Sequence, residues 1–128
     1  MIKKNKKKLI LLSDLDPILT RFYKFKFEKL KNWKSIIAKS YPKALKQIEK
    51  EKPQIVISDI ILKQGNGFKL IKKIRKSKNK KISKIPIIIL TDLSQLSDSK
   101  KAKKLGATEY LIKNEVSLND VIKKIEDL

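Results

Sequence analysis

The chain contains no cysteine and no histidine among its 128 residues. Without cysteine, it has no disulfide framework, no thiol nucleophile and no cysteine-bound metal. Without histidine, it has no imidazole for acid–base catalysis near neutral pH and no histidine metal site. Any chemistry must therefore rest on carboxylates, lysine and hydroxyl groups.

Long hydrophobic runs are also missing, and a membrane-spanning helix needs about 20 consecutive apolar residues. The apolar segment 9–12 follows a basic start but is too short for the core of a secretory signal, and Asp14 and Asp16 come soon after it. We therefore expect a cytoplasmic protein without membrane association. Its length fits one domain, which we place at residues 8–128 after a basic tail at residues 1–7.

Arginine is scarce although the net charge is +20, because only Arg21 and Arg75 among the 33 basic residues are arginine. The excess positive charge favours a polyanion such as nucleic acid as partner. It fits better a protein drawn from a lysine-rich proteome, with solvated lysines spread along the chain. Aromatic and basic residues alternate only in RFYKFKF (residues 21–27), where the helical spacing fits core packing as well as base stacking.

Five short apolar runs recur along the chain: LILLS, WKSIIA, QIVIS, PIIIL and YLIK. The runs at 9–12, 55–57 and 87–90 are continuously apolar, which is typical of parallel strands covered on both faces. Isoleucine and valine dominate them and favour strand over helix.

Helical patterns fill the segments between these runs. Asp16-Pro17 reads as an N-cap followed by a first-turn proline, and Ser117 with Asp120 resembles a capping box. We predict helices over 17–31, from Tyr41, from Gly67, over 94–105 and over 118–128, with a basic loop at 76–84. Alternation of strands and helices predicts an α/β fold with a doubly wound parallel sheet.

Polar side chains follow the predicted strands, and ligands of such sheets bind beyond the carboxyl ends of the strands. These side chains belong to Asp14, Asp16, Asp59, Thr91, Asp92 and Lys113. We therefore expect three or four carboxylates, a hydroxyl and a lysine at one edge of the sheet. Clustered carboxylates repel one another unless a hard cation such as Mg²⁺ neutralises them. An aspartate there can act as nucleophile towards phosphorus, with lysine and hydroxyl stabilising the phosphoryl oxygens.

The joint order and spacing of these segments resemble the response-regulator receiver family over nearly the whole chain. KPQIVISDIILKQGNGFKLIKKIR looks like its third strand, phosphoacceptor loop and third helix. IPIIILTDLS is similar to its fourth strand with the switch hydroxyl, and LGATEYLIK to its fifth strand with the switch aromatic and the lysine. The resemblance implies a five-stranded sheet of flavodoxin-like order 2-1-3-4-5 flanked by five helices.

The same resemblance assigns roles to individual residues of this chain. It makes Asp59 the phosphoacceptor, Thr91 the switch hydroxyl that also contacts the phosphate, Tyr110 the switch aromatic and Lys113 a phosphate-contacting lysine. It implies Mg²⁺ as cofactor, held by Asp14, Asp59 and the backbone carbonyl of Ile61. The family activity is not that of an enzyme, beyond self-catalysed phosphoryl transfer and dephosphorylation on the aspartate.

Two positions depart from the family pattern. Leu15 stands where the second of two adjacent acids usually contacts the metal. Asp16 can substitute for that acid or can cap the following helix; both interpretations remain open. Asn114 replaces the proline that usually follows the lysine, so we expect a trans bond there, because a cis bond before a residue other than proline costs about 2.5–4 kcal/mol.

The leading functional interpretation is a stand-alone receiver that accepts phosphate from a histidine kinase or phosphotransfer protein. Lysines at 100, 101, 103 and 104 make the predicted fourth helix basic, so we expect an acidic downstream partner. One alternative is a pseudo-receiver, a binding module that is not phosphorylated. Another is a nucleic-acid-binding protein that uses its lysine-rich surface.

Overall fold

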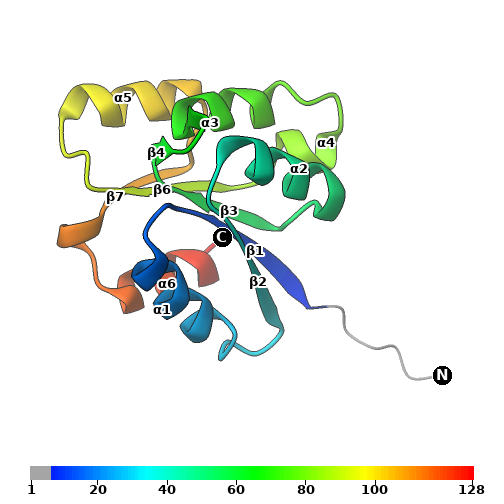
Figure 1. Cartoon of the computed structure of the whole chain (residues 1–128), viewed down its shortest axis with the longest axis vertical. Helices are drawn as coiled ribbons and strands as arrows, with labels where there is room; N and C mark the ends of the chain where they lie inside the picture. The colour runs from blue at the N-terminus through cyan, green and yellow to red at the C-terminus, as the bar shows by residue number, and fades with distance from the viewer. Residues whose placement is uncertain (1–6) are drawn as a thin grey trace.

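In the computed structural model, which describes residues 7–128, five parallel strands form one sheet (Figure 1). These strands are β1 (Lys8–Ser13), β2 (Trp33–Ala38), β3 (Ile55–Ser58), β6 (Ile87–Thr91) and β7 (Glu109–Ile112). Their spatial order is β2-β1-β3-β6-β7. Numbered along the chain as strands of this sheet only, that order is 2-1-3-4-5, and the predicted topology is confirmed. Residues 1–6 lie outside the described part, and with them most of the predicted basic tail.

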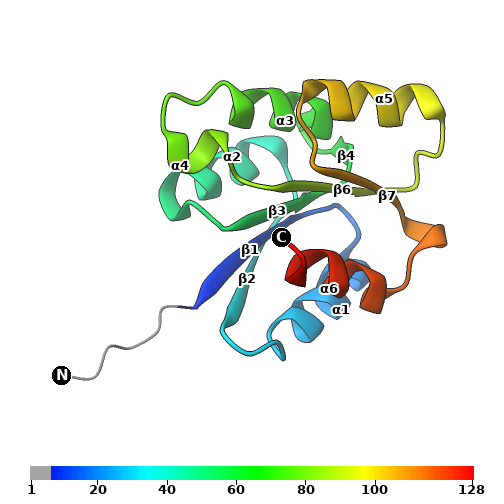
Figure 2. The ribbon, with the colours of Figure 1, turned by 180° about the vertical axis from the view of Figure 1, so that it is seen from behind.

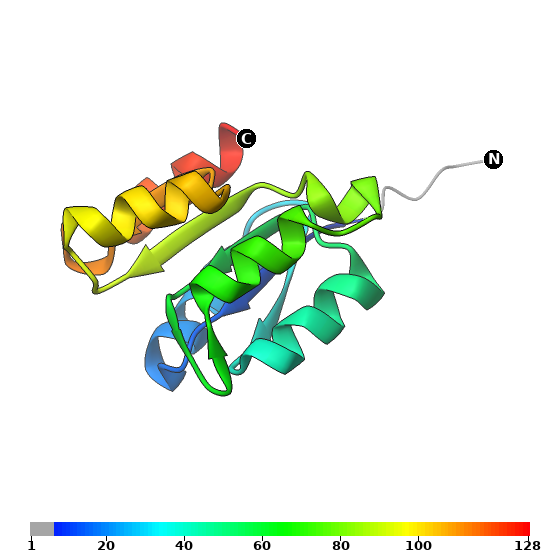
Figure 3. The same ribbon diagram turned by 90° about the horizontal axis from the view of Figure 1, so that it is seen from above.

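Helices cover both faces of the sheet (Figures 1–3). On one face lie α1 (Pro17–Phe27) and α6 (Leu118–Glu126), and on the other lie α2 (Tyr41–Glu51), α3 (Gly67–Arg75) and α5 (Leu96–Leu105). Short elements complete the chain: the hairpin strands β4 (Ile61–Leu62) and β5 (Gly65–Asn66), the helix α4 (Lys80–Ser83) and a 3₁₀ turn (Lys113–Glu115). No helix among the residues described is long and apolar enough to cross a membrane.

The continuous apolar runs contribute side chains to two hydrophobic cores, one on each face of the sheet. Successive strand residues point to opposite faces, so Leu11 and Val56 pack under α2 and α3, while Ile10 and Ile57 pack under α1 and α6. This double coverage is why these strands are apolar at every position rather than at every second one.

Helix ends follow the predicted capping residues more closely than the predicted lengths. Ser117 and Asp120 form the expected reciprocal capping box of α6. The first helix, however, ends at Phe27 rather than near Lys31. Beyond it the chain tightens into a turn, in which Leu30 N–H donates to the Phe27 carbonyl and Asn32 adopts a left-handed conformation (φ 71°). That reversal starts β2 at Trp33, which is half-buried at the beginning of the strand.

The segment 76–84 is not the basic loop that its composition predicts. Residues 80–83 form α4, which buries Ile82 against the α2–α3 core. The guanidinium of Arg75 fixes this segment, because it donates to the carbonyls of Ser83 and Ile85 as well as to that of Gly106 at the end of α5. One apolar residue among lysines gives too weak a periodic signal to predict such a short helix.

The aromatic residues of RFYKFKF divide between the two interpretations left open. Tyr23 and Phe27 are buried under the sheet with their ring centroids 5.5 Å apart. Phe22 and Phe25 point outward, with 53% and 57% of their surface exposed. Core packing therefore accounts for only half of the aromatic side chains of this segment.

Candidate functional site

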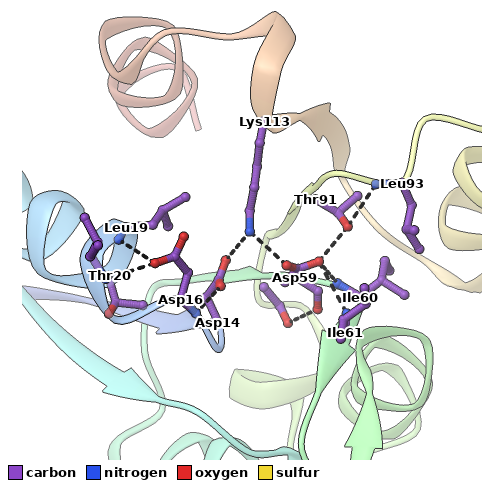
Figure 4. Close-up of polar contacts among 12 residues, drawn as sticks. Asp14, Asp16, Leu19, Thr20, Asp59, Ile60, Ile61, Thr91, Leu93 and Lys113 are labelled. Atoms are coloured by element: carbon purple, nitrogen blue, oxygen red, sulfur yellow. Dashed lines mark hydrogen bonds and ion pairs between the residues drawn. The ribbon is translucent and has the colours of Figure 1, made fainter.

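Asp59 lies directly after β3 and is 7% exposed. Its Oδ1 accepts hydrogen bonds from the backbone N–H of Ile60 at 2.6 Å and of Ile61 at 3.3 Å. The hydroxyl of Thr91, at the end of β6, donates to the same oxygen at 2.5 Å. The carboxylate is thus held by its own loop and by the neighbouring strand, as the predicted sheet order requires (Figure 4).

Lys113 closes the site from the end of β7. Its Nζ lies 2.9 Å from Oδ2 of Asp59 and 2.9 Å from Oδ2 of Asp14, so one ammonium bridges two carboxylates (Figure 4). All described peptide bonds are trans, including the bond to Asn114, as we expected. The trans bond does not turn the lysine away from the aspartates.

Burial and charge act against each other in this cluster. Asp14 is 2% exposed, and burial raises its pKa, while the N–H of Asp16 and Lys113 act to lower it. Burial alone would lower the pKa of Lys113, but hydrogen bonds to Asp59 and Asp14 outweigh it and raise that pKa to about 12. The lysine therefore stays charged and compensates the two aspartates, which would otherwise repel one another.

Asp16 caps α1 instead of joining the cluster. Its Oδ1 accepts from the N–H of Ile18 at 2.9 Å and of Leu19 at 3.1 Å, which confirms the capping interpretation. Asp92 is exposed beyond β6. The expectation of three or four converging carboxylates is therefore wrong: within the described residues no group of three acidic side chains is suited to a metal. Two carboxylates meet, because the carboxylate of Asp16 is engaged as the N-cap of α1.

Thr91 and Tyr110 are linked through the loop that follows β6. The N–H of Leu93 lies 3.4 Å from the Thr91 hydroxyl, and the Tyr110 hydroxyl donates to the Leu93 carbonyl at 2.8 Å. Tyr110 is half-buried beside this loop. A displacement of Thr91 would therefore change the hydrogen bond of Tyr110 on the neighbouring strand.

Gly67 supports the site in a way that sequence reasoning missed. A Cβ at this position would lie 2.5 Å from the backbone oxygen of Asp59. Its N–H donates to the Ile60 carbonyl at 2.7 Å, so the start of α3 packs directly on the phosphoacceptor loop. The available signal was a glycine at the first helical position after Asn66, where the φ angle alone does not require glycine.

The donors present fit a hard cation held by few protein ligands. Mg²⁺ prefers oxygen, keeps several waters and often takes only one or two carboxylates from the protein. Asp14 and Asp59 supply two buried carboxylates at the same edge of the sheet. Leu15, half-buried beside them, supplies no oxygen.

Several solved structures share this architecture. A CheY-like receiver domain protein of Methanospirillum hungatei has 26% sequence identity and a TM-score of 0.84, with 95% of this chain and 93% of that chain covered. The receiver domain of Francisella response regulator 1452 has 25% identity and a TM-score of 0.83, with 94% and 95% covered. The BeF₃-activated receiver domain of RstA from Klebsiella pneumoniae, at 21% identity, has a TM-score of 0.82 over 93% and 96% of the two chains and shows the shared fold.

Sequence comparison gives the same answer over almost the full length. No protein of curated function matches the chain significantly. The sequence model of the response regulator receiver domain matches residues 10–126. The chain therefore belongs to the response regulator receiver domain family, the receiver component of two-component signalling.

Proposed function

We propose that this chain accepts a phosphoryl group on Asp59 from a histidine kinase or phosphotransfer protein and signals by protein–protein contact as a stand-alone receiver. In this step an oxygen of Asp59 attacks phosphorus, the P–N bond to the donor histidine breaks, and an acyl phosphate forms. The observation that carries the proposal is the Asp59 carboxylate itself, bonded to Thr91 through one oxygen and to Lys113 through the other.

The neighbouring groups are placed for the charge that the transfer develops. Lys113 pairs with an Asp59 oxygen now and would pair with a phosphoryl oxygen afterwards, while the Thr91 hydroxyl would donate to another. Asp14, Asp59 and the backbone carbonyl of Ile61 would hold Mg²⁺. When bound, the ion neutralises charge on the carboxylates and on the phosphoryl oxygens.

The link from Thr91 to Tyr110 supports a role for both in switching. If the Thr91 hydroxyl leaves the carboxylate for a phosphoryl oxygen, it draws the loop at Leu93 with it, and the Tyr110 hydroxyl is bonded to that loop. We infer that phosphorylation changes the surface formed by α5, β7 and α6.

Incubation with acetyl phosphate and Mg²⁺ tests the proposal directly. We expect a mass increase of one phosphoryl group, confined to the peptide that carries Asp59 and lost under mild alkali, as an acyl phosphate requires. An unchanged mass at high acetyl phosphate and Mg²⁺ concentrations would contradict the proposal.

Replacing Leu15 should strengthen metal binding. In Leu15→Asp a third carboxylate joins Asp14 and Asp59, and we expect the Mg²⁺ dissociation constant to fall about tenfold, since each added ligand charge favours a hard cation. Amide chemical shifts followed during a Mg²⁺ titration measure the constant. Leu15→Asn, which adds an oxygen without charge, is the matched control. Its Mg²⁺ dissociation constant should lie between those of the wild type and Leu15→Asp.

The phosphorylated form should be long-lived. Ile61 and Leu93 stand two residues beyond the proposed phosphoacceptor and the switch hydroxyl, positions that influence water attack in the family. Neither side chain can orient a water, and Ile61 is 53% exposed at the rim of the site. We expect the phosphoprotein half-life to shorten by about tenfold in Ile61→Asn, less than a general base contributes, because an amide orients a water but does not take its proton. Loss of radiolabelled phosphate with time measures it, and a wild-type half-life of seconds with Mg²⁺ would contradict this reasoning.

A pseudo-receiver is the second candidate, and two observations favour it. Leu15 offers no oxygen, and the carboxylate of Asp16 is engaged at the N-terminus of α1. In that case Lys113 serves chiefly to neutralise Asp14 and Asp59, and the protein works as a constitutive binding module. The acetyl phosphate experiment separates the two functions.

The partner in signalling should be acidic. The outer residues of α5 include Lys100, Lys101, Lys103 and Lys104, all exposed, and the Lys101 ammonium lies 4.3 Å from the Phe68 ring centroid. This basic face borders β7, where Tyr110 lies. A partner bound to the face would therefore lie next to the residue that changes on switching. We place this signalling in the cytoplasm.

A further inference from the structure

The surface formed by α3 and α4 is rich in lysine and has no acidic residue. Between residues 60 and 91 the sequence contains neither aspartate nor glutamate, although the whole chain has 13 acidic residues. A lysine-rich proteome explains why lysine stands in place of arginine, but it does not explain why acids are missing from one segment. The exposed lysines that define this α3–α4 surface are Lys69, Lys72, Lys73, Lys76, Lys80 and Lys81.

These lysines have no anionic partner within residues 7–128, the part of the chain that the structure describes. The ion pairs found there lie at the Asp59 site, within α1 and between Lys124 and Glu109. The lysines at 69, 72, 73 and 76 are three or four positions apart, so neighbouring charges on the helix repel one another. The α3–α4 surface therefore attracts an anionic partner, which would relieve this repulsion.

A hollow of about 250 Å³ opens beside these lysines, between α2, α3 and α4. It lies on the side of α3 that faces α2, away from α5 (Figure 3). Lys73 and Lys76 belong to its wall, so the hollow and the α3–α4 surface are continuous. The apolar part of the wall is aliphatic and consists of Leu45, Ile48, Ile74 and Ile82. Sites for drug-sized ligands measure about 300–1,000 Å³, so this smaller hollow suits a single side chain.

We propose that the α3–α4 surface binds an acidic protein segment that inserts one aliphatic side chain into the hollow. Carboxylates of the segment would meet the lysines, and charge complementarity of this kind speeds and orients association. A leucine or isoleucine would pack against the aliphatic wall, as an anchor residue does at the centre of an interface. The site is separate from the α5 face and does not depend on phosphorylation.

Two other polyanions fit the surface less well. A nucleic acid would meet the lysines, but it has no aliphatic group for the hollow, and the described residues that line the hollow include no aromatic ring on which a base could stack. An anionic membrane requires apolar side chains that protrude into it. Among the residues described, no large and exposed apolar side chain lies on α2, α3 or α4.

Fluorescence anisotropy with two labelled peptides tests the proposal on the full chain. One peptide has a leucine between two equal runs of glutamate, and the other has a serine in place of the leucine. Because both peptides carry the same charge, only the apolar anchor differs. We expect the leucine peptide to bind about tenfold more tightly, which is 1.4 kcal/mol, because the hollow buries its side chain.

Charge variants assign the binding to this surface. Lys73→Gln with Lys76→Gln should weaken the binding of both peptides. Lys29→Gln with Lys123→Gln removes the same charge just after α1 and on α6, at the opposite face of the sheet, and should weaken it less. Glu49 is the one acidic residue among the described residues that line the hollow. Glu49→Gln should therefore tighten the binding of both peptides, a gain that misfolding would not produce.

Filling the hollow should remove the preference for leucine. Ser77 lies in its wall, and Ser77→Leu should make the affinities of the two peptides equal. Ser77→Ala is the matched control, because both variants lose the hydrogen bond that the N–H of Asn79 donates to the Ser77 hydroxyl at 3.2 Å, and only leucine occupies the space. Ser77→Ala should keep the preference, and thermal unfolding verifies that both variants remain folded.

Four results would overturn the proposal. Absence of peptide binding at low salt would exclude the site, and equal wild-type affinities for the two peptides would mean that binding follows charge alone. Equal losses from the two lysine pairs would place the binding elsewhere. Tighter binding of a short DNA duplex or of vesicles rich in phosphatidylserine, weakened by Lys73→Gln with Lys76→Gln, would assign the surface to a nucleic acid or a membrane. No step of the test involves Asp59, so its result does not bear on phosphorylation.

Discussion

Asp59→Asn will keep the fold and lose every response to a phosphoryl mimic. The substitution preserves the volume of the side chain and an oxygen for the N–H of Ile60, which donates at 2.6 Å. It removes the nucleophilic charge, and a neutral amide neither forms an acyl phosphate nor coordinates beryllofluoride as a carboxylate does. We therefore expect incorporation from acetyl phosphate to fall below detection, rather than by a measurable factor.

Amide NMR during a titration with Mg²⁺ and beryllofluoride measures this response best. Trp33 begins β2 and lines a hollow with Lys8 and Pro86 at the amino ends of the strands, so its fluorescence reports the wrong edge of the sheet. Shifts should concentrate at Thr91, Leu93 and Tyr110 in the wild type. Asp14→Asn, which retains the nucleophile, is the matched control and should respond at higher Mg²⁺ concentration. Saturable shifts in Asp59→Asn would contradict the assignment of the phosphoacceptor.

Removing Lys113 should produce the largest loss of stability. Lys113→Met keeps the aliphatic stem but leaves Asp14 and Asp59, both buried, without the cation that joins them. Breaking a buried ion pair by removing one partner costs about 3–5 kcal/mol, and we expect the free energy of unfolding near pH 7 to fall by about 3 kcal/mol. Urea unfolding measures it. Lys124→Met removes an exposed pair with Glu109 and is the matched control; it should leave stability almost unchanged, because solvent screens exposed pairs.

Neutralising one carboxylate should reverse most of this loss. The double variant Lys113→Met with Asp14→Asn has one buried charge fewer to compensate, and the two substitutions should be strongly non-additive. Lowering the pH should also restore part of the stability of Lys113→Met. Burial raises the pKa of Asp14, so its carboxylate is readily protonated and neutralised. Additive effects of the two substitutions would mean that the charges at this edge do not interact.

The pH dependence of wild-type stability follows from the same two groups. The pKa of Lys113 is about 12 in the folded protein, against 10.5 for the free side chain. Its contribution, roughly 2 kcal/mol, is therefore fully present below pH 10.5 and is lost as the pH rises through 12. Asp14 acts in the acid range: because burial raises its pKa, stability falls as the pH rises from 3.8 through the folded pKa. Lys113→Met should lose the alkaline transition.

Local sequence rules placed most of the elements of the fold correctly. Continuous apolar runs predicted the parallel strands because their residues are covered on both faces, and Ser117 with Asp120 predicted the start of α6 through a local hydrogen-bonded motif. The errors occur where the hydrophobic pattern of a segment does not decide its structure. The end of α1 depends on a turn in which Asn32 is left-handed, and α4 depends on carbonyls that receive the Arg75 guanidinium from another helix. Neither contact is encoded in the pattern of the segment itself.

The same distinction between local pattern and tertiary contact applies to the candidate site. The sequence by itself determined the sheet and the strand ends that carry Asp14, Asp59, Thr91 and Lys113, since parallel strands of known order bring their carboxyl ends to one edge. Only the tertiary structure decided that Lys113 bridges two carboxylates and that Asp16 turns away into α1. It also decided which aromatic residues of RFYKFKF stay outside. The reason is physical: the strands and their ends follow from the hydrophobic pattern, and their order from the family resemblance, but the direction of one side chain depends on the burial and hydrogen bonds that distant segments supply.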